Sequence, residues 1–391
     1  MRNILLYSYF CPNNLSGGVE HVTLSLHKIL IANNFNCHVI FEQYAGETSS
    51  YQFIKLPEDN TIEYISKLIT EHEIEAIIIQ GNRQFIATAN NVKALINRHL
   101  RIIYVNHGDP FYEFSTVNIN TYCFYYSNSK GLKSLRALSK MLFFPIFKVL
   151  KTHKYKKTER ELQKYVDYIV FISENSAKEY NKFFKNRLYC KIGYANNPLS
   201  YSVSEDIISN LQLKEKCVIY VGRMEEYTKK ISLVLQIWRI ISNNAKYDDW
   251  KLYILGDGPD KKDLEKYALK IGCKHVSFLG HCDPLDFYKR APILMFTSIS
   301  EGWGLTITEA MQNGCIPIVF KSYPASSDII NNNQNGLLID YPNISQYVDK
   351  LELLINNKNM RVMMANNAIQ YLKRFNDKNI YNQWQNIFNK L

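Results

Sequence analysis

The feature that most constrains the fold is an alternation of short apolar segments with segments of helical hydrophobic spacing. Ile4–Phe10 has the continuous apolar character of a strand buried on both faces, and Gly17-Gly18 follow it. His21–Asn33 then carries apolar residues at helical spacing, and Cys37–Phe41 is a second apolar segment. Strands that alternate with helices form parallel sheets through right-handed crossovers. The alternation therefore predicts an α/β fold.

The alternation runs through the chain twice, which indicates two domains. The first set ends near Pro198, where a polar stretch follows, and the second begins at Cys217–Arg223. A chain of 391 residues is long enough for two or three domains. We predict two doubly wound, Rossmann-like domains, residues 1–200 and 201–391, that face a central cleft; the last helix could cross back to the first domain. Ligands of such sheets bind beyond the carboxyl ends of the strands.

Composition excludes several classes of protein. With 46% hydrophobic and 21% charged residues, the chain is globular rather than disordered. No apolar run approaches the roughly 18–20 residues that a bilayer span needs, and the first apolar run is too short for a secretion signal. The eight cysteines include no C-x-x-C pair, so we expect reduced, buried thiols and no metal site. These features favour a cytoplasmic protein.

The densest functional signal is Ser298–Pro317, SISEGWGLTITEAMQNGCIP. Glu301 and Glu309 flank Gly302 and Gly304, an apolar strand precedes the segment, and a helix is expected to begin near Leu305. Glycines allow the backbone to approach a ligand closely, and the amides of a helix N-terminus bind phosphate. The segment therefore predicts a site for a phosphorylated ligand.

This segment resembles the E-G-[FW]-G-L…E motif of glycosyltransferase family 4 (group 1), whose members have the two-domain GT-B architecture. The resemblance extends over nearly the whole chain and is stronger in the second half. It implies that Glu301 contacts the hydroxyls of a donor sugar and that Glu309 binds the ribose hydroxyls. It also implies that Gly304 and the amides of Leu305 and Thr306 meet the donor diphosphate.

A second signal is Tyr220-Val221-Gly222-Arg223, with Lys229 six residues later. Arginine offers phosphate a planar fork, and lysine offers it a mobile charge. The segment resembles the V-G-R…K element of the same family, which implies that Gly222 lies in the donor site and that Arg223 and Lys229 hold the leaving diphosphate. Lys230 replaces the family's usual Gly or Asn, so either Lys229 or Lys230 could be the phosphate ligand.

The first half contains two weaker signals. Gly17 and Gly18 stand between the first strand and the first helix, where the family's first loop faces the acceptor and the donor phosphates. His107 ends the apolar segment Arg101–His107 and precedes a glycine. A lone histidine is more often structural than functional, but this position matches the family's histidine, which contacts the donor sugar near the reacting centre.

Positive charge is concentrated in residues 130–164. This segment holds eleven Lys or Arg and two Glu, a net charge of +9 out of +11 for the chain. An apolar stretch, LFFPIF, lies inside it. A basic amphipathic stretch with aromatic residues predicts docking on an anionic membrane surface. A solvated helical arm is the alternative, and no motif accompanies it for nucleic acid.

Together these features predict a retaining, metal-independent hexosyltransferase that moves a sugar from a nucleoside-diphosphate sugar to a lipid-linked glycan acceptor in polysaccharide, lipopolysaccharide or glycolipid synthesis. His107, Arg223, Lys229 and Glu301 are the expected catalytic residues. We expect no cofactor, a UDP-sugar rather than a GDP-sugar, and a peripheral position on the inner face of the membrane. No D-x-D triplet is present to hold a metal. A non-catalytic binding subunit and another GT-B enzyme, such as a sugar-nucleotide epimerase, remain alternatives.

Overall fold

The computed structural model describes residues 2–13, 17–44, 53–96, 99–115, 131–201 and 205–391. The chain divides into two compact units. Unit 1 comprises Met1–Pro198 together with Asp377–Leu391, and unit 2 comprises Leu199–Asn376. Lys130, the first residue of the predicted basic segment, lies outside the described residues.

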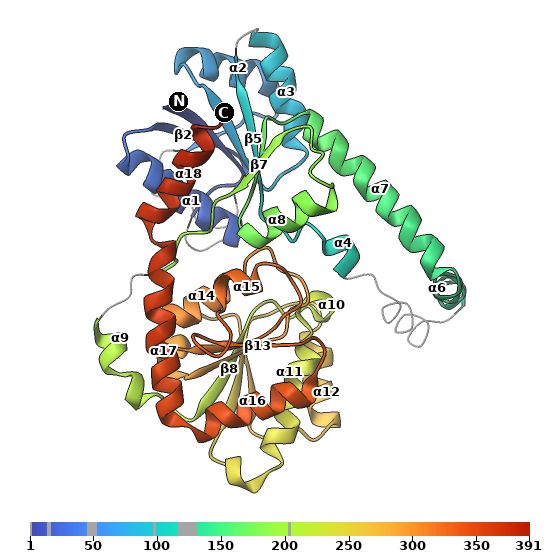
Figure 1. The fold of residues 1–391 in the computed structure, drawn as a ribbon, viewed down its shortest axis with the longest axis vertical. Coiled ribbons are helices and arrows are strands. Elements are labelled where there is room, and N and C mark those ends of the chain that lie inside the picture. Colours follow the sequence, from blue (N-terminus) through green and yellow to red (C-terminus); the bar gives the residue numbers. More distant parts are fainter. Residues whose placement is uncertain (1, 14–16, 45–52, 97–98, 116–130, 202–204) are drawn as a thin grey trace. The chain divides into compact units, whose positions relative to one another are not determined.

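Unit 1 contains a seven-stranded parallel sheet in the order β3-β2-β1-β4-β5-β6-β7 (Figure 1). Its strands are β1 (Asn3–Phe10), β2 (Asn36–Gln43), β3 (Ile54–Lys55), β4 (Ala76–Gln80), β5 (Arg101–Asn106), β6 (Tyr168–Phe171) and β7 (Lys191–Tyr194). Its helices are α1 (Gly18–Ala32), α2 (Thr61–Glu71), α3 (Phe85–Ile96), α4 (Tyr112–Ser115), α6 (Leu132–Leu142), α7 (Phe144–Lys164), α8 (Glu174–Phe183) and α18 (Asp377–Phe388). The order reverses between β1 and β4, which is the topological switch point where such sheets bind ligands.

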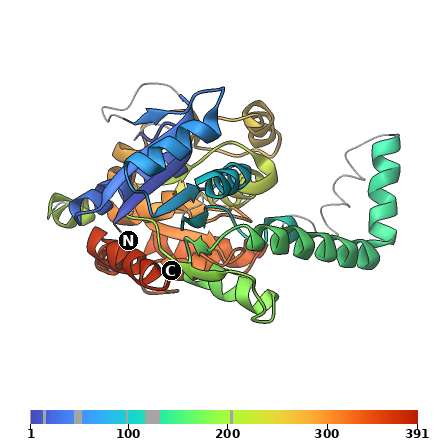
Figure 2. The same cartoon turned by 90° about the horizontal axis from the view of Figure 1, so that it is seen from above.

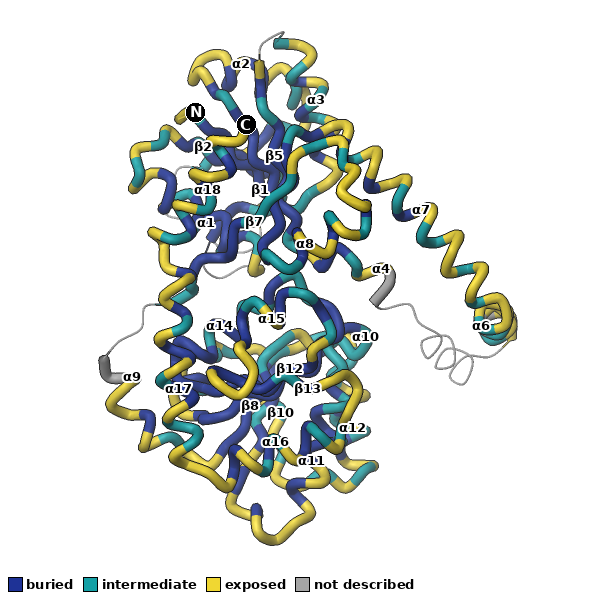
Figure 3. Tube along the Cα trace, viewed as in Figure 1, coloured by how far each residue is buried: buried dark blue, intermediate teal, exposed yellow. Residues whose placement is uncertain are grey.

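The central strands of unit 1 are buried because helices cover the sheet (Figure 3). All five residues of β4, AIIIQ, are buried, as the unbroken apolar pattern predicts for a central parallel strand. Tyr7 on β1 stacks on Phe85 at the start of α3, with ring centroids 3.5 Å apart. Packing of this kind fixes where each strand ends, and therefore where the loops at the switch point lie.

The C-terminal helix α18 packs within unit 1. Its apolar face buries Ile380, Trp384 and Ile387. Gln383 accepts a hydrogen bond from the Asn196 backbone (2.8 Å) and donates one to the Asn196 side chain (2.9 Å). The sequence analysis did not resolve this helix as a separate element after α17.

Helix α7 is buried in its second half and exposed in its first half. Tyr155, Glu159 and Gln163 are buried against unit 1, and the Tyr155 hydroxyl donates to the Pro110 carbonyl (2.5 Å). Residues 132–154, which we call the arm, extend away from the sheet (Figure 2). Pro145 lies in the first turn of α7, where proline is tolerated, so the expected apolar run is divided between α6 and α7.

Unit 2 contains a six-stranded parallel sheet in the order β10-β9-β8-β11-β12-β13. Its strands are β8 (Cys217–Val221), β9 (Lys251–Leu255), β10 (Val276–Gly280), β11 (Ile293–Phe296), β12 (Ile316–Phe320) and β13 (Leu337–Ile339). Its helices are α9 (Glu205–Ser209), α10 (Glu226–Lys229), α11 (Ile231–Ser242), α12 (Lys261–Lys270), α13 (Leu285–Arg290), α14 (Leu305–Gln312), α15 (Ser326–Ile329), α16 (Ile344–Asn356) and α17 (Lys358–Leu372). Here the order reverses between β8 and β11. Both sheets are therefore doubly wound, as the sequence predicts.

Candidate functional site

The switch point of unit 2 brings together the loops that follow β8 and β11. Lys229, at the end of α10, and Glu301 form an ion pair with 2.5 Å between Nζ and Oε1. The Thr297 hydroxyl donates to the Lys229 carbonyl (2.8 Å), and the Ile299 amide donates to the Thr228 carbonyl (2.9 Å). These bonds fix the two loops to one another. Two residues that are distant in sequence thus become neighbours, as their predicted roles require.

Lys230 differs from Lys229 in its surroundings. Its backbone is left-handed, with φ of 51°. Its Nζ lies 5.9 Å from the centroid of the Tyr227 ring, whereas Lys229 is the lysine that reaches Glu301. Gly and Asn adopt the left-handed backbone conformation more readily than lysine does, which explains why lysine is unusual at this position.

Glycines allow the loop after β9 to lie against the loop after β8. A Cβ atom on Gly256, whose φ is 129°, would lie 2.0 Å from the carbonyl oxygen of Gly222. A Cβ on Gly258 would lie 2.4 Å from the Met224 carbonyl. Arg223 follows Gly222 and is exposed, and within the described part of the chain its guanidinium makes no hydrogen bond or ion pair. It is therefore near the end of β8 but does not contact the Lys229–Glu301 pair.

Helix α14 begins at the same edge of the sheet. Gly304 precedes it with φ of 102°, and the Ile307 amide donates to the Gly304 carbonyl (2.9 Å). The amides of Leu305 and Thr306 belong to the first turn, where helical N–H groups have no partner inside the helix. The start of α14 therefore offers N–H donors and the positive end of the helix dipole to an anion.

Glu309 lies one turn further along α14. Its carboxylate accepts hydrogen bonds from the Ser200 hydroxyl (2.9 Å) and the Tyr288 hydroxyl (3.1 Å). Burial raises the pKa of this carboxyl group, while the two hydroxyls partly oppose the shift. Glu309 and Glu301 have different partners, which is consistent with their different predicted roles.

Two buried phenols beneath the glycine turns were missed by the sequence analysis. The Tyr220 hydroxyl lies 3.1 Å from the position of a Cβ on Gly222, and the Tyr323 hydroxyl lies 3.2 Å from that of a Cβ on Gly304. Neither hydroxyl has a hydrogen-bond partner among the described residues. Burial raises the pKa of each phenol, and the charge of Glu301 adds to both shifts. Both look like ordinary core aromatics in the sequence, so no local signal could have identified them.

The glycines of unit 1 lie at the start of α1. Gly17 precedes the helix and Gly18 begins it. A Cβ on Gly17 would lie 2.8 Å from the Glu20 carboxylate. Burial raises the pKa of Glu20. Both glycines are thus at the switch point, and Gly17 lies beside the Glu20 carboxylate.

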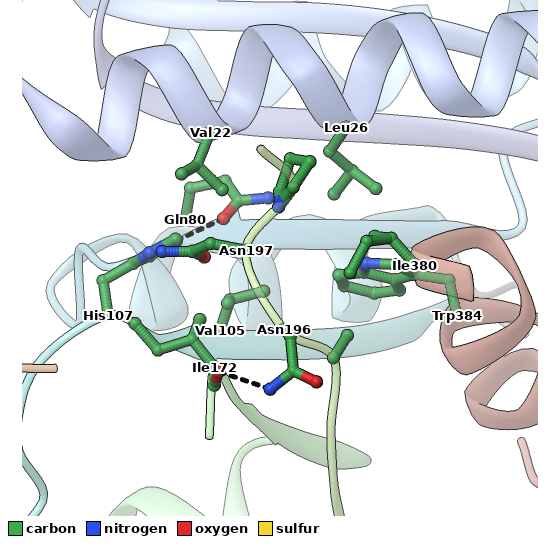
Figure 4. A pocket seen from close by; sticks show the side chains of 12 residues that line it. Val22, Leu26, Gln80, Val105, His107, Ile172, Asn196, Asn197, Ile380 and Trp384 are labelled. Atoms are coloured by element: carbon green, nitrogen blue, oxygen red, sulfur yellow. Dashed lines mark hydrogen bonds between the residues drawn. The ribbon is translucent and has the colours of Figure 1, made fainter. Parts of the chain in front are cut away.

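His107 follows β5 and contacts the end of β4. Its Nε2 lies 2.5 Å from Oε1 of Gln80, and burial lowers its pKa to about 4. Both side chains line a small pocket that is also bounded by α1, the segment Ala195–Pro198 and α18 (Figure 4). Gln80 carried no signal in the sequence, because a polar residue at the end of an apolar strand is common.

The last residue of β4 and the three residues after it, which we call the β4 loop (residues 80–83), contact β1, β5, the residue after β5 and α7. Each of its residues makes a different contact: Gln80 with His107 (2.5 Å), the Gly81 carbonyl with the Tyr104 hydroxyl (3.3 Å), Asn82 with the Tyr7 hydroxyl (2.7 Å) and Arg83 with Glu159 (2.5 Å). Glu159 belongs to the buried half of α7. The β4 loop therefore joins the switch point of unit 1 to the helix that carries the arm.

Comparison with known proteins shows similarity that is centred on the second unit. Residues 204–371 match the family described as glycosyl transferases group 1. The match covers most of unit 2. The match includes Arg223, Lys229, Glu301 and Glu309.

Relatives extend the similarity beyond this domain. An uncharacterized glycosyltransferase of Haemophilus influenzae is 23% identical over 387 residues, which cover 95% of this chain and 96% of that protein. A Campylobacter jejuni α-1,4-N-acetyl-D-galactosaminyltransferase, named for an undecaprenol-diphosphate-linked acceptor, is 27% identical over 205 residues. That alignment covers 52% of this chain and only 56% of the relative.

A solved structure supports the fold of the whole chain. The structure of Anabaena HepE in complex with UDP and glucose has a TM-score of 0.69 with this chain, at 14% sequence identity. The match covers 100% of both chains. The architecture of two parallel-sheet, Rossmann-like units is GT-B. Among the residues that the structure describes, no helix has the length and apolarity that crossing a membrane requires.

Proposed function

We propose that the protein is a retaining glycosyltransferase that transfers a hexosyl group from a UDP-sugar to a glycan or lipid-linked acceptor in cell-surface polysaccharide or glycolipid synthesis. Unit 2 binds the donor, and unit 1 binds the acceptor. The names of the relatives support the acceptor class: one acts on an undecaprenol-diphosphate-linked glycan and another is a poly(ribitol-phosphate) α-N-acetylglucosaminyltransferase. The UDP and glucose in the HepE structure support the donor class.

The observation that carries this proposal is the Lys229–Glu301 pair beside the start of α14. A nucleoside diphosphate needs cations and N–H donors, while a sugar needs a carboxylate for its hydroxyls. The pair supplies one group for each ligand. Its side chains are only 23% and 17% exposed, so both charges act where water screens them weakly.

Donor binding exchanges the partners of this pair. The diphosphate takes the ammonium of Lys229, and a sugar hydroxyl donates to the carboxylate of Glu301. Neither charge is then left buried without a partner, which would be costly. Arg223 is exposed and has no competing partner among the described residues, so it remains available to the leaving diphosphate.

The reaction breaks the bond between the sugar C1 and the diphosphate oxygen and forms one between C1 and the acceptor oxygen. Charge develops on the departing diphosphate, where Arg223, Lys229 and the first amides of α14 stabilise it as fixed donors. The proton of the acceptor hydroxyl passes to the departing phosphate oxygen. We propose that this transfer occurs on the same face of the sugar and needs no metal ion.

Thermal unfolding with a panel of nucleotides tests the donor assignment. A ligand at about 100 times its Kd adds about 2.7 kcal/mol to the free energy of unfolding. We expect UDP to raise the Tm more than GDP, with the same shift in EDTA. A larger shift with GDP would reverse the base assignment, and no shift with any nucleotide would contradict the proposal.

The anomeric configuration of the transferred sugar, measured by NMR, tests retention.

We also propose that the arm holds the enzyme on the anionic inner face of the membrane. The large exposed apolar side chains of the arm are Leu132, Leu135, Leu142, Phe143, Ile146, Val149 and Leu150. Exposed bases, among them Arg136, Lys140, Lys148 and Lys154, lie along the same helices. Exposed apolar residues beside cations suit the boundary between lipid headgroups and acyl chains. A surface that served only as a solvated helix would not need apolar residues of this size.

A further inference from the structure

The hydrogen bond between Gln80 and His107 constrains the chemistry of the imidazole. Gln80 is buried, with 2% exposure, and its Oε1 lies 2.5 Å from Nε2 of His107. An amide oxygen can only accept a hydrogen bond, so Nε2 must carry the proton. Nδ1 is then the acceptor nitrogen of a neutral ring. Among the described residues, Nδ1 has no hydrogen-bond partner.

The amide of Gln80 is held by the elements around it. Gly81, next in the chain, has φ of 75°, and a Cβ there would lie 3.6 Å from the His107 ring. Its carbonyl accepts from Tyr104, and Asn82 donates to Tyr7. The β4 loop is therefore anchored on both neighbouring strands, β1 and β5, and the amide has little freedom to leave the ring.

The pocket beside this pair favours the same amide orientation (Figure 4). Asn197 also lines the pocket, and its Oδ1 has no partner in the described part of the chain. The NH₂ group of Gln80 is likewise without a partner there. With Oε1 turned to His107, a donor and an acceptor border the pocket. The reversed amide would place two acceptor oxygens on it and would force the opposite tautomer of His107.

We propose that Gln80 is a positioning residue that holds His107 as the neutral Nε2–H tautomer, so that Nδ1 accepts a hydrogen bond from a sugar hydroxyl of the substrate. This inference rests on the proposed glycosyltransferase function. It assigns His107 to a neutral hydroxyl and excludes it as a cationic ligand of the diphosphate. The hydroxyl can belong to the donor sugar or to the acceptor sugar, and the kinetics separate the two.

Burial supports the assignment. The pKa of His107 is lowered to about 4 by burial alone, with no contribution from a charged neighbour. An imidazole of this kind is neutral at physiological pH and is a weak base. The imidazole therefore contributes an oriented hydrogen-bond acceptor to substrate binding, and neither a positive charge nor a general acid or base.

The tautomer can be measured without any substrate. Two-bond ¹H–¹⁵N spectra of the full-length protein labelled with ¹⁵N-histidine distinguish Nε2–H, Nδ1–H and the imidazolium, and His107→Asn assigns the signal. We expect Nε2–H between pH 8 and pH 5.5. An Nδ1–H pattern, or a charged ring at neutral pH, would overturn the proposal.

Variants of Gln80 then connect the tautomer to turnover. Gln80→Leu should mix the tautomers and lower kcat/KM about five- to tenfold, the size of one hydrogen bond. The loss appears in UDP-sugar hydrolysis if the hydroxyl belongs to the donor, and only in transfer to a glycan acceptor if it belongs to the acceptor. Gln80→Glu should favour the imidazolium, so that activity falls as the pH decreases. Gln163→Leu is the matched control, because Gln163 is also buried and hydrogen-bonded in unit 1 but does not contact His107. It should leave the His107 spectrum and kcat/KM unchanged.

The outcomes separate this inference from the proposed function. A higher KM for the UDP-sugar in Gln80→Leu assigns the hydroxyl to the donor, and a higher KM only for a glycan acceptor assigns it to the acceptor. If UDP binds but Gln80→Leu and Gln80→Glu both retain normal kinetics and pH profiles, the positioning role is wrong while the function stands. If no nucleotide binds, the function fails, although the spectrum still reports the tautomer.

Discussion

The two sheets share one strand order around their switch points but place different chemistry there. In unit 2, the loops after β8 and β11 are joined by the charged pair of Lys229 and Glu301. In unit 1, β1 and the β4 loop are joined by hydrogen bonds rather than by an ion pair: Asn82 donates to the Tyr7 hydroxyl (2.7 Å), which donates to the Glu42 carboxylate (2.6 Å). The same topology therefore fixes where a ligand binds and leaves open what it binds.

This difference matches the two ligands of a glycosyl transfer. A leaving diphosphate requires charge and N–H donors, which unit 2 places beside the start of α14. A sugar hydroxyl requires oriented neutral groups, which in our proposal unit 1 provides through Gln80 and His107. If the comparison is right, substitutions in unit 2 should affect nucleotide binding and departure, and those in unit 1 should affect the sugar.

The largest expected effect concerns Lys229. Lys229→Ala should lower turnover roughly 10²- to 10³-fold, because it removes a donor to the leaving diphosphate and leaves Glu301 without its counter-charge. Hydrolysis of the UDP-sugar measures this. Lys230→Ala is the matched control, since Lys230 lies over Tyr227 instead, and it should change turnover little. The reverse result would show that Lys230 is the phosphate ligand.

The difference between the units also explains what the sequence could predict. Lys229 lies in the segment after β8, and Glu301 and Glu309 lie in the segment after β11. Each segment is a local succession of strand, turn and helix that resembles a family motif, so these residues could be singled out from the sequence. Gln80 and Tyr323 acquire their roles from partners that are distant in sequence or from burial beneath a glycine turn. No local pattern encodes such contacts. The alternation of strands and helices was sufficient for both sheets, whereas the α18 helix depends on tertiary packing against unit 1.

The next largest effect concerns the arm, which belongs to unit 1 alone. Lys148 and Lys154 of the arm and Lys157, one turn beyond it on α7, are exposed. Replacing all three with Gln should weaken binding to phosphatidylglycerol vesicles on the order of 100-fold, at about 1 kcal/mol for each lysine. Lys151 is left unchanged because its Nζ donates to the Glu113 carbonyl (2.6 Å). Sedimentation with vesicles measures the binding, which should weaken but persist at high salt because apolar insertion is not screened.

A matched control exists in unit 2. Lys262, Lys266 and Lys270 are exposed on α12, and replacing them with Gln removes the same charge. This variant should bind vesicles almost as the wild type does. Equal losses in the two variants would show that only net charge matters, and no loss in the arm variant would leave the arm as a solvated helix.

A smaller effect is expected from Glu309. Glu309→Ala should raise the Kd for UDP by roughly 10- to 100-fold, the range for a lost charged hydrogen bond of about 1.5–3 kcal/mol. Titration calorimetry measures it. Tyr288→Phe keeps the carboxylate and removes only one of its donors, so its effect should be smaller. An unchanged Kd in Glu309→Ala would contradict the ribose assignment and weaken the contrast between the units.

The smallest expected effect is a difference in how the units respond to acid. In unit 1, burial lowers the pKa of His21, His27, His38 and His107, the last to about 4 from 6.5. Below pH 6.5 the unfolded chain binds protons that these rings do not bind in the folded protein, so stability falls as the pH decreases. His107 alone should cost on the order of 1 kcal/mol at pH 5.5. In unit 2, burial raises the pKa of Glu226 and Glu309, so protonation of these groups in the folded state stabilises that unit.

Hydrogen exchange between pH 7 and pH 5.5, corrected for intrinsic rates and read separately for peptides of each unit, can resolve this difference. Protection should decrease in unit 1 and not in unit 2, although Glu20 opposes the histidines because burial raises its pKa. His107→Asn should remove on the order of 1 kcal/mol of the loss at pH 5.5. His99→Asn, which replaces an exposed histidine of the same unit, should remove none. Equal changes in the two units would show that the contrast between a histidine-containing switch point and one built on the Lys229–Glu301 pair does not extend to stability.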